Sequence, residues 1–211
     1  MAKVEQLLAA RKGISESMAR LRQQQQALPY AQTHLVTAIV ALQQEQAAID
    51  RELATLTAQS DAVARLRAVP GIGPVTAAAV AACLTSKAFG HPDQFVAYIG
   101  LDVRVRDSGQ HRGRRTLAHQ GDAELRRLLY LCAQANLRRK DAENPFKGQY
   151  ARERGKGLSS TGALCAVARK RARTCWSLVT HGTRYAAGRV HRQPVTTKMG
   201  ENVPHPLDRE P

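Results

Sequence analysis

Apolar residues recur every seven positions over residues 4–56, and this heptad repeat is the most regular pattern in the sequence. Two stripes run side by side, one of leucines and isoleucines and one that mixes apolar with polar residues, which is typical of a coiled coil. Pro29 follows a run of four glutamines and should kink or end the first helix. An antiparallel helical hairpin, one kinked helix in a dimer, and a local helical pair packed on the rest of the chain all satisfy the pattern. The first stripe is Leu7, Ile14, Leu21, Leu28, Leu35, Leu42, Ile49 and Leu56, and the second is Val4, Arg11, Met18, Gln25, Gln32, Ile39, Gln46 and Leu53.

Residues 1–60 are therefore expected to form a coiled-coil segment that drives self-association into a homo-oligomer. Polar residues within the second stripe would weaken the seam but could fix its register.

The pattern after residue 60 predicts a helical domain over 61–185 and a disordered tail over 186–211. The fold class is mainly α, with the long N-terminal helices followed by a helix-hairpin-helix and a short basic β-hairpin over 102–117. Helices are expected to start at Pro92, at Asp122, at Asn144-Pro145 and at Ser159 or Ser160, where Pro or a capping side chain suits the first turn.

The centre of the predicted helix-hairpin-helix, over about 61–84, is a tight turn at Gly71-Ile72-Gly73 between two apolar runs. Glycine and proline are unfavourable within helices, so the chain should turn here, with Pro74 in the first turn of the second helix. Free N–H groups at that turn and the positive end of the helix dipole would favour a phosphate. The turn therefore predicts a grip on a nucleic-acid backbone through Gly71, Ile72 and Gly73; the plainer interpretation is an ordinary turn between packed helices.

A formal net charge of +15 and a pI near 10.4 indicate a polyanionic partner, in this interpretation DNA. The excess lies in the second half of the chain, because residues 104–143 carry ten Lys and Arg against five acids and residues 147–192 carry eleven against one. The arginines predicted to contact DNA are Arg104, Arg106, Arg112, Arg114, Arg115, Arg126 and Arg127.

The four cysteines form no C-x-x-C pair and are expected to be buried, reduced thiols of a cytoplasmic protein. The seven histidines lack metal-ligand spacing, so no metal site is predicted within the chain. No long apolar run or signal peptide indicates a membrane.

Several linked motifs between residues 62 and 180 resemble the C-terminal domain of the insertion-sequence one-ten transposases, which are DEDD-type, RNA-guided recombinases. The heptad segment resembles the coiled coil that precedes this domain in the family. The motifs are Pro70-Gly71-Ile72-Gly73-Pro74, residues 95–101, Ser108-Gly109 with Arg112-Gly113-Arg114, residues 121–130, Asn144-Pro145 and residues 163–171.

The resemblance implies DNA transposition by site-specific recombination, with Ser108 as the serine nucleophile and a structured guide RNA as a candidate partner. The family also has an RNase H-like domain with four metal-binding acidic residues, and no corresponding set exists in this sequence. We therefore expect the C-terminal part of such a transposase, inactive alone, with Mg²⁺ needed only together with the acidic domain. The alternative is a non-catalytic nucleic-acid-binding module, in which Ser108 is a turn residue.

Overall fold

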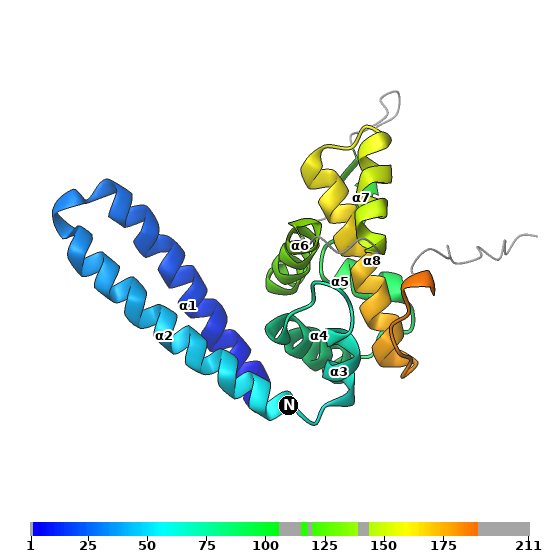
Figure 1. Ribbon diagram of the computed structural model, residues 1–211, viewed down its shortest axis with the longest axis horizontal. Helices are drawn as coiled ribbons and strands as arrows, with labels where there is room; N and C mark the ends of the chain where they lie inside the picture. Colours follow the sequence, from blue (N-terminus) through cyan, green and yellow to red (C-terminus); the bar gives the residue numbers. More distant parts are fainter. Residues whose placement is uncertain (1, 106–114, 118–119, 139–143, 190–211) are drawn as a thin grey trace, which may run out of the picture.

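The computed structural model describes residues 2–105, 115–117, 120–138 and 144–189 and is mainly helical, as the sequence predicts (Figure 1). Two long helices project from a domain of shorter helices. In chain order the elements are α1 (Ala2–Ala27), the 3₁₀ helix η1 (Pro29–Ala31), α2 (Gln32–Thr57), α3 (Asp61–Arg67), α4 (Pro74–Ser86), α5 (Pro92–Tyr98), β1 (Val103–Val105), β2 (Arg115–Leu117), α6 (Ala123–Arg138), α7 (Pro145–Gly155), α8 (Ser160–Thr180) and the 3₁₀ helix η2 (Ala187–Arg189).

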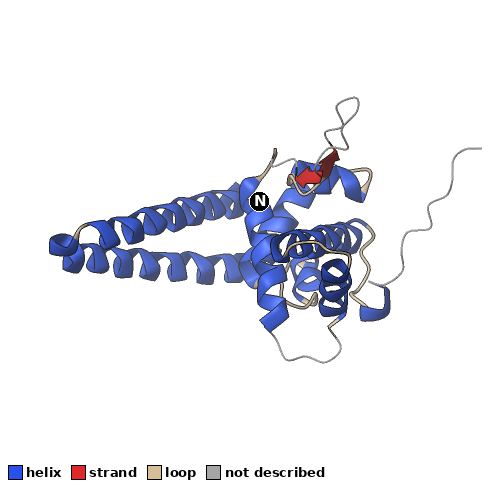
Figure 2. Cartoon of the chain, turned by 90° about the horizontal axis from the view of Figure 1, so that it is seen from above, coloured by secondary structure: helices blue, strands red, loops and turns tan. Residues whose placement is uncertain are grey.

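Helices α1 and α2 form an antiparallel hairpin within one chain (Figures 1 and 2). Pro29 lies in the short turn between them and ends the first helix, because its ring cannot continue the helical hydrogen bonds. Of the arrangements that the heptads allow, the chain adopts the internal hairpin. Self-association remains a prediction.

Polar residues of the second stripe fix the register of this hairpin. The guanidinium of Arg11 donates to the Asp50 carboxylate over 2.5 Å, and the Gln46 amide donates to the Ser15 hydroxyl over 2.6 Å. Both pairs cross from α1 to α2, so a sliding of one helix past the other would break them.

Burial along the two stripes is unequal. The apolar members of the second stripe, Val4, Met18, Ile39 and Leu53, are all buried, whereas Leu28 and Leu56 of the leucine stripe are 50% and 42% exposed. Leu28 lies in the turn and Leu56 near the end of α2, so the exposed members are the two at the ends of the hairpin. At its base, Val4 and Leu53 pack with Ala82 of α4, which attaches the hairpin to the domain.

The domain core is built around α8, which contacts α3, α4, α5, α6 and α7. Helix α4 is buried on nearly every side, and most of its buried residues are alanines. Their small side chains let the neighbouring helices pack closely, so the core is dense although the chain has few aromatic residues. Phe95 and Phe146 are fully buried in this core.

Several predicted helix starts are confirmed by capping hydrogen bonds. The side chain of Asn144 accepts from the Phe146 N–H, that of Ser159 accepts from the Gly162 N–H, and that of Asp122 accepts from the Leu125 N–H. All four cysteines are free and buried, as predicted.

Strands β1 and β2 pair antiparallel, with Val103 opposite Leu117, within the predicted basic β-hairpin. The residues that join the strands, 106–114, lie outside the described part of the chain. Most of the predicted disordered tail, from residue 190 on, also lies outside it, and η2 occupies part of the remainder. The predicted domain boundaries stay predictions.

Candidate nucleic-acid interface

The Gly71-Ile72-Gly73 turn lies between α3 and α4, as the sequence predicts. Gly71 has a φ of +83°, and the Ile72 N–H donates to the Val69 carbonyl over 3.1 Å, which closes the turn. Val69 and Ile72 are both buried and hold the turn against the core. The turn is therefore rigidly packed on its inner side.

Helix α4 begins without a capping side chain. Gly73 is its N-cap residue, and the first helical hydrogen bond runs from the Ala77 N–H to the Gly73 carbonyl. The N–H groups of Val75 and Thr76 thus precede the first helical donor, Ala77, and those of Gly71 and Gly73 have no acceptor within the described residues. These unpaired donors and the positive end of the α4 dipole are suited to an anion.

The two glycines of the turn have different surroundings. A Cβ on Gly71 would lie 3.1 Å from Arg171 Nη1, from the Asn136 Cβ and from the Cys132 carbonyl oxygen, whereas a Cβ on Gly73 would meet nothing within 4 Å. Gly73 also has an ordinary extended backbone, with φ −83° and ψ 172°. The fold therefore requires glycine at position 71 but not at position 73.

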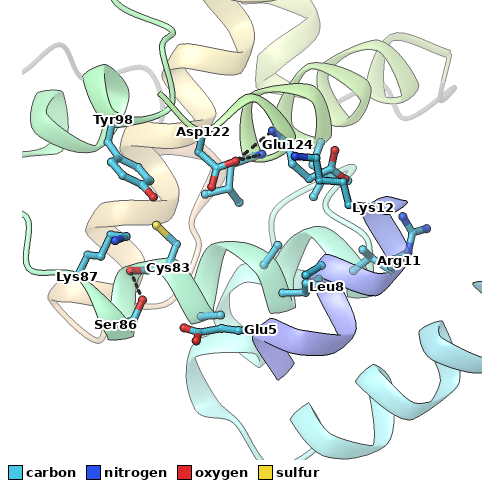
Figure 3. Close-up of a pocket in the computed structure, with 16 residues that line it drawn as sticks. Glu5, Leu8, Arg11, Lys12, Cys83, Ser86, Lys87, Tyr98, Asp122 and Glu124 are labelled. Atoms are coloured by element: carbon cyan, nitrogen blue, oxygen red, sulfur yellow. Dashed lines mark hydrogen bonds between the residues drawn. The ribbon is translucent and has the colours of Figure 1, made fainter. Parts of the chain in front are cut away.

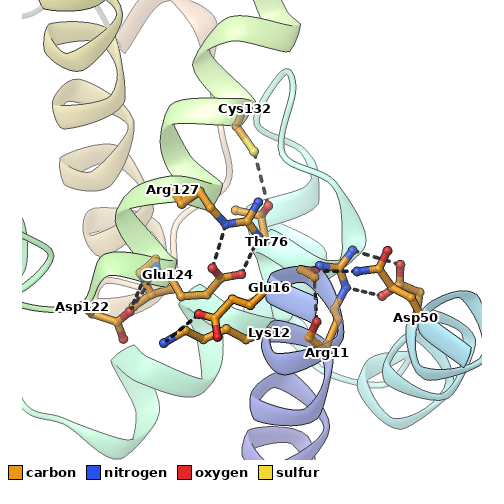
Figure 4. Close-up of polar contacts among 12 residues, drawn as sticks. Arg11, Lys12, Glu16, Asp50, Thr76, Asp122, Glu124, Arg127 and Cys132 are labelled. Carbon is orange, nitrogen blue, oxygen red and sulfur yellow. Dashed lines mark hydrogen bonds and ion pairs between the residues drawn. The ribbon is translucent and has the colours of Figure 1, made fainter. Parts of the chain in front are cut away.

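Two of the predicted DNA-contacting arginines have partners within the domain. Arg126 Nη1 donates to the Ile99 carbonyl over 3.0 Å. Arg127 forms a bidentate salt bridge with the Glu124 carboxylate, in which Nε donates to Oε2 over 2.8 Å and Nη2 donates to Oε1 over 2.6 Å (Figure 4). Arg127 remains partly exposed beyond this pair, with 43% of its side chain accessible.

The remaining predicted site residues lie on or between the two strands. Arg104 belongs to β1 and Arg115 to β2, opposite Thr116 and Val105 respectively, and only their backbone is described. The other four lie outside the described residues; they are Ser108, Arg106, Arg112 and Arg114.

The start of β1 is held by arginines from two different helices. Arg126 of α6 binds the Ile99 carbonyl, and Arg169 of α8 donates through Nε to the Leu101 carbonyl over 2.8 Å. Between these carbonyls, Gly100 has a φ of +69°, and a Cβ there would collide with the Gln120 carbonyl. The segment that leads into the strand pair is therefore fixed to the domain from both sides.

Helices α7 and α8 carry cations that the list of predicted DNA contacts leaves out. Burial lowers the pKa of Lys170, and the nearby positive charges of Arg173 and Arg152 lower it further. Arg173 is also paired with Asp93 over 2.6 Å. Lys170 and Arg152, in contrast, form no ion pair among the described residues, so their positive charge is not neutralised within the domain. The charge count over 147–192 was the sequence signal for it.

A cleft of about 550 Å³ separates the base of α1 from α4 and the start of α6 (Figure 3). Cys83, Lys87 and Asp122 line it, together with Glu5. Burial, with a smaller contribution from Asp122, raises the pKa of the Cys83 thiol to about 11, so this thiol is a poor nucleophile at neutral pH.

Two classes of site are absent from the described residues. No group of three or more His, Cys, Asp or Glu side chains there could hold a metal ion. No helix there is both long and apolar enough to cross a membrane.

Comparison with known proteins shows which family the helical domain resembles. Residues 63–151, from α3 into α7, match the transposase IS116/IS110/IS902 family. The chain is 32% identical over 136 residues to the transposase for insertion sequence element IS1328 of Yersinia enterocolitica, an alignment that covers 64% of this chain and 41% of that protein. It is 30% identical over 132 residues to an uncharacterized 44.8 kDa protein of insertion element IS116 from Streptomyces clavuligerus, covering 62% of this chain and 32% of that protein. A probable family 20 transposase of Pseudomonas aeruginosa is 29% identical over 143 residues, covering 67% and 42% respectively.

The aligned region thus spans less than half of each of these relatives. It contains the glycine turn, the strand pair and α6, which are the elements that carry the predicted site residues. Residues 63–151 therefore resemble the IS116/IS110/IS902 transposase family, and this part of the chain is similar to known transposases.

Proposed function

We propose that this chain is the DNA-binding part of an insertion-sequence transposase and that it contributes Ser108 as the nucleophile of strand exchange. The observation that supports binding best is the uncapped start of α4, where unpaired N–H groups follow a glycine turn. Such groups contact phosphate and read no bases, so they would hold the DNA backbone regardless of sequence.

In this proposal the cations of the second half of the chain extend the contact along the backbone. Arg127 is partly exposed, and Lys170 and Arg152 add uncompensated charge on α7 and α8. The arginines on and between the strands, Arg104, Arg106, Arg112, Arg114 and Arg115, would surround the phosphate that Ser108 attacks. They would stabilise the negative charge that develops on that phosphate.

The proposed chemistry is attack of the Ser108 hydroxyl oxygen on a DNA phosphorus. A serine–phosphate ester forms, the bond from phosphorus to the leaving sugar oxygen breaks, and the hydroxyl proton leaves with a base. Mg²⁺, held by the acidic domain that the family resemblance implies, would supply charge stabilisation for this step. The anchored start of β1 gives the nucleophile-bearing segment a fixed origin.

Two partners complete the proposal. Two apolar side chains one turn apart on α2, Val36 and Val40, are 41% and 45% exposed and support a homo-oligomer through residues 1–60. A guide RNA would bind through the same phosphate chemistry as DNA. A DNA substrate also agrees with the cytoplasmic location expected from the sequence.

The test is a search for a covalent DNA–protein species when the chain is combined with the acidic domain, Mg²⁺ and a candidate guide RNA. We expect the adduct with the natural chain and none with Ser108→Ala, whose affinity for duplex DNA should stay within a few-fold. Ser159→Ala, which removes a hydroxyl from a helix cap, is the matched control and should keep the adduct. An adduct that persists in Ser108→Ala would show that another residue is the nucleophile. DNA binding without any adduct would favour the non-catalytic module.

A further inference from the structure

Arg171 is a fully buried cation that lies against the inner side of the glycine turn. It belongs to α8 and has a relative exposure of 0%. Its Nη1 atom is 3.1 Å from the position that a Cβ on Gly71 would occupy. Only the absence of a side chain at Gly71 lets the guanidinium approach the turn so closely.

The guanidinium of Arg171 has no hydrogen-bond acceptor among the described residues. Its Nε, Nη1 and Nη2 atoms are all buried and unpartnered. The ring of Phe146 lies 4.2 Å from its central carbon and offers a cation–π contact on one face only. An arginine buried without a carboxylate is costly, so a fold that keeps it should gain a compensating anion in some state.

The same turn contains backbone N–H donors that have no acceptor among the described residues. These are the unpaired N–H groups of Gly71 and Gly73 and those of the first turn of α4, and Arg171 Nη1 lies against Gly71 of the same turn. An anion bound to these N–H groups would therefore interact with the α4 dipole and with the full positive charge of Arg171. In the poorly solvated interior, that charge is screened much less than a surface charge.

We propose that Arg171 and the Gly71–Gly73 turn form a single phosphate-binding site, in which the buried guanidinium sets the affinity of the turn for a DNA backbone phosphate. This inference rests on the proposed DNA binding and adds to it the residue that supplies the charge. Arg171 is a positioning residue in this site, because it acts through the turn and does not reach the surface.

A competing explanation places the compensation inside the domain. The Asn136 side-chain oxygen and the Tyr185 hydroxyl are also buried and unpartnered. Water molecules that bridge these acceptors to Arg171 would satisfy the guanidinium without any external anion.

The first experiment uses inorganic phosphate as the probe. Thermal unfolding of the full chain is measured in sodium phosphate and in sodium chloride of equal ionic strength. We expect phosphate to raise the Tm of the natural chain above its value in chloride, because a ligand of the native state stabilises it. The extra rise should be lost in Arg171→Met and in Gly73→Val. The control Arg173→Met removes a charge from the same helix, at a site that is 41% exposed, and should keep the rise. An equal response of natural chain and Arg171→Met would overturn the proposal and favour internal water.

The second experiment measures affinity for duplex DNA. We expect about tenfold weaker binding for Arg171→Met, from the loss of a unit charge near one phosphate, and at most a twofold change for Arg173→Met. Arg171→Met and Gly73→Val should be non-additive, since both act on the same phosphate. Independent, additive losses would contradict the shared site. If the natural chain bound no DNA, the proposed function would fail, whereas the phosphate response would still decide the role of Arg171.

Methionine is a safe replacement, because buried ion groups exchanged for apolar side chains of similar volume often leave stability unchanged or higher. Should Arg171→Met fail to fold, Arg171→Lys keeps the charge without the planar fork. It should then keep most of the phosphate response, and a complete loss in a folded Arg171→Lys would contradict an electrostatic role.

Discussion

The two glycines of the turn can be separated experimentally, because the fold needs one of them and DNA binding is proposed to need both. At Gly71, a side chain must adopt a φ of +83° and must fit against three atoms at 3.1 Å. The left-handed conformation costs roughly 1–2 kcal/mol and the crowding about 1–3 kcal/mol. Gly71→Ala should therefore lower the free energy of unfolding by about 2–5 kcal/mol, which corresponds to a fall in Tm of roughly 10 °C.

At Gly73 the same substitution should be harmless to the fold. A Cβ meets nothing within 4 Å, and the backbone is extended. Gly73→Ala is expected to change the free energy of unfolding by less than about 1 kcal/mol, because the lower entropy of the unfolded state offsets the poorer fit of alanine at an N-cap. Gly73→Val places two methyl groups beside the start of α4 and should weaken DNA binding about tenfold through loss of charge-assisted hydrogen bonds to phosphate.

The assay pairs thermal unfolding by circular dichroism with titration of two unrelated DNA duplexes. Both duplexes should lose the same factor of affinity with Gly73→Val, since backbone N–H groups read phosphate and not sequence. A folded Gly73→Val chain that binds both duplexes as tightly as the natural chain would remove the turn from the interface. A Gly71→Ala chain of unchanged stability would refute the packing argument itself.

Three further predictions follow from charge and exposure. DNA affinity should fall by a factor of roughly a hundred or more between about 50 and 200 mM salt, and a flat salt dependence in the titration would exclude a contact made by many cations. Val36 and Val40 on α2 are 41% and 45% exposed, so the double substitution Val36→Glu and Val40→Glu should reduce self-association, measured by sedimentation, without loss of helicity. Unchanged assembly would show that this face of α2 is not the contact. Arg126→Ala should lower the free energy of unfolding by about 1.5–3 kcal/mol through loss of its bond to the Ile99 carbonyl, whereas Arg127→Ala should cost under about 1 kcal/mol, and urea unfolding that ranked them the other way would refute these roles.

Many of the positions where helices begin and end could be predicted, because residues close by in the sequence determine them. Pro29 ends a helix wherever it stands, and the caps at Asn144 and Ser159 act on N–H groups two or three residues away. The heptads could not decide between an internal hairpin and a dimer, since both present the same stripe to a partner helix. The two stripes are buried unequally partly because the base of the α1–α2 hairpin packs on α4. That contact joins residues far apart in the chain, so no short stretch of sequence predicts it.

The site was harder to predict, because a charged residue shows its partner only in three dimensions. The sequence places Arg126, Arg127 and Arg171 alike on basic helices. In the fold, Arg126 holds a carbonyl, Arg127 pairs with a carboxylate on its own helix, and Arg171 is buried without an acceptor. A count of positive charge therefore shows where the cations lie along the chain but not the partner of each side chain.

The arginines bound to backbone carbonyls show how fold and proposed function are linked. Arg126 of α6 donates to the Ile99 carbonyl, and Arg169 of α8 donates to the Leu101 carbonyl. Both carbonyls lie just before β1. A cation used in this way contributes little to an external phosphate, because its donors are directed into the domain. It does, however, define where the strand pair begins, and the segment with Ser108 starts from that point. In the proposed function, the positive charge of this domain is divided between cations that contact DNA and cations that hold the start of β1, and only the first group should make binding depend on salt.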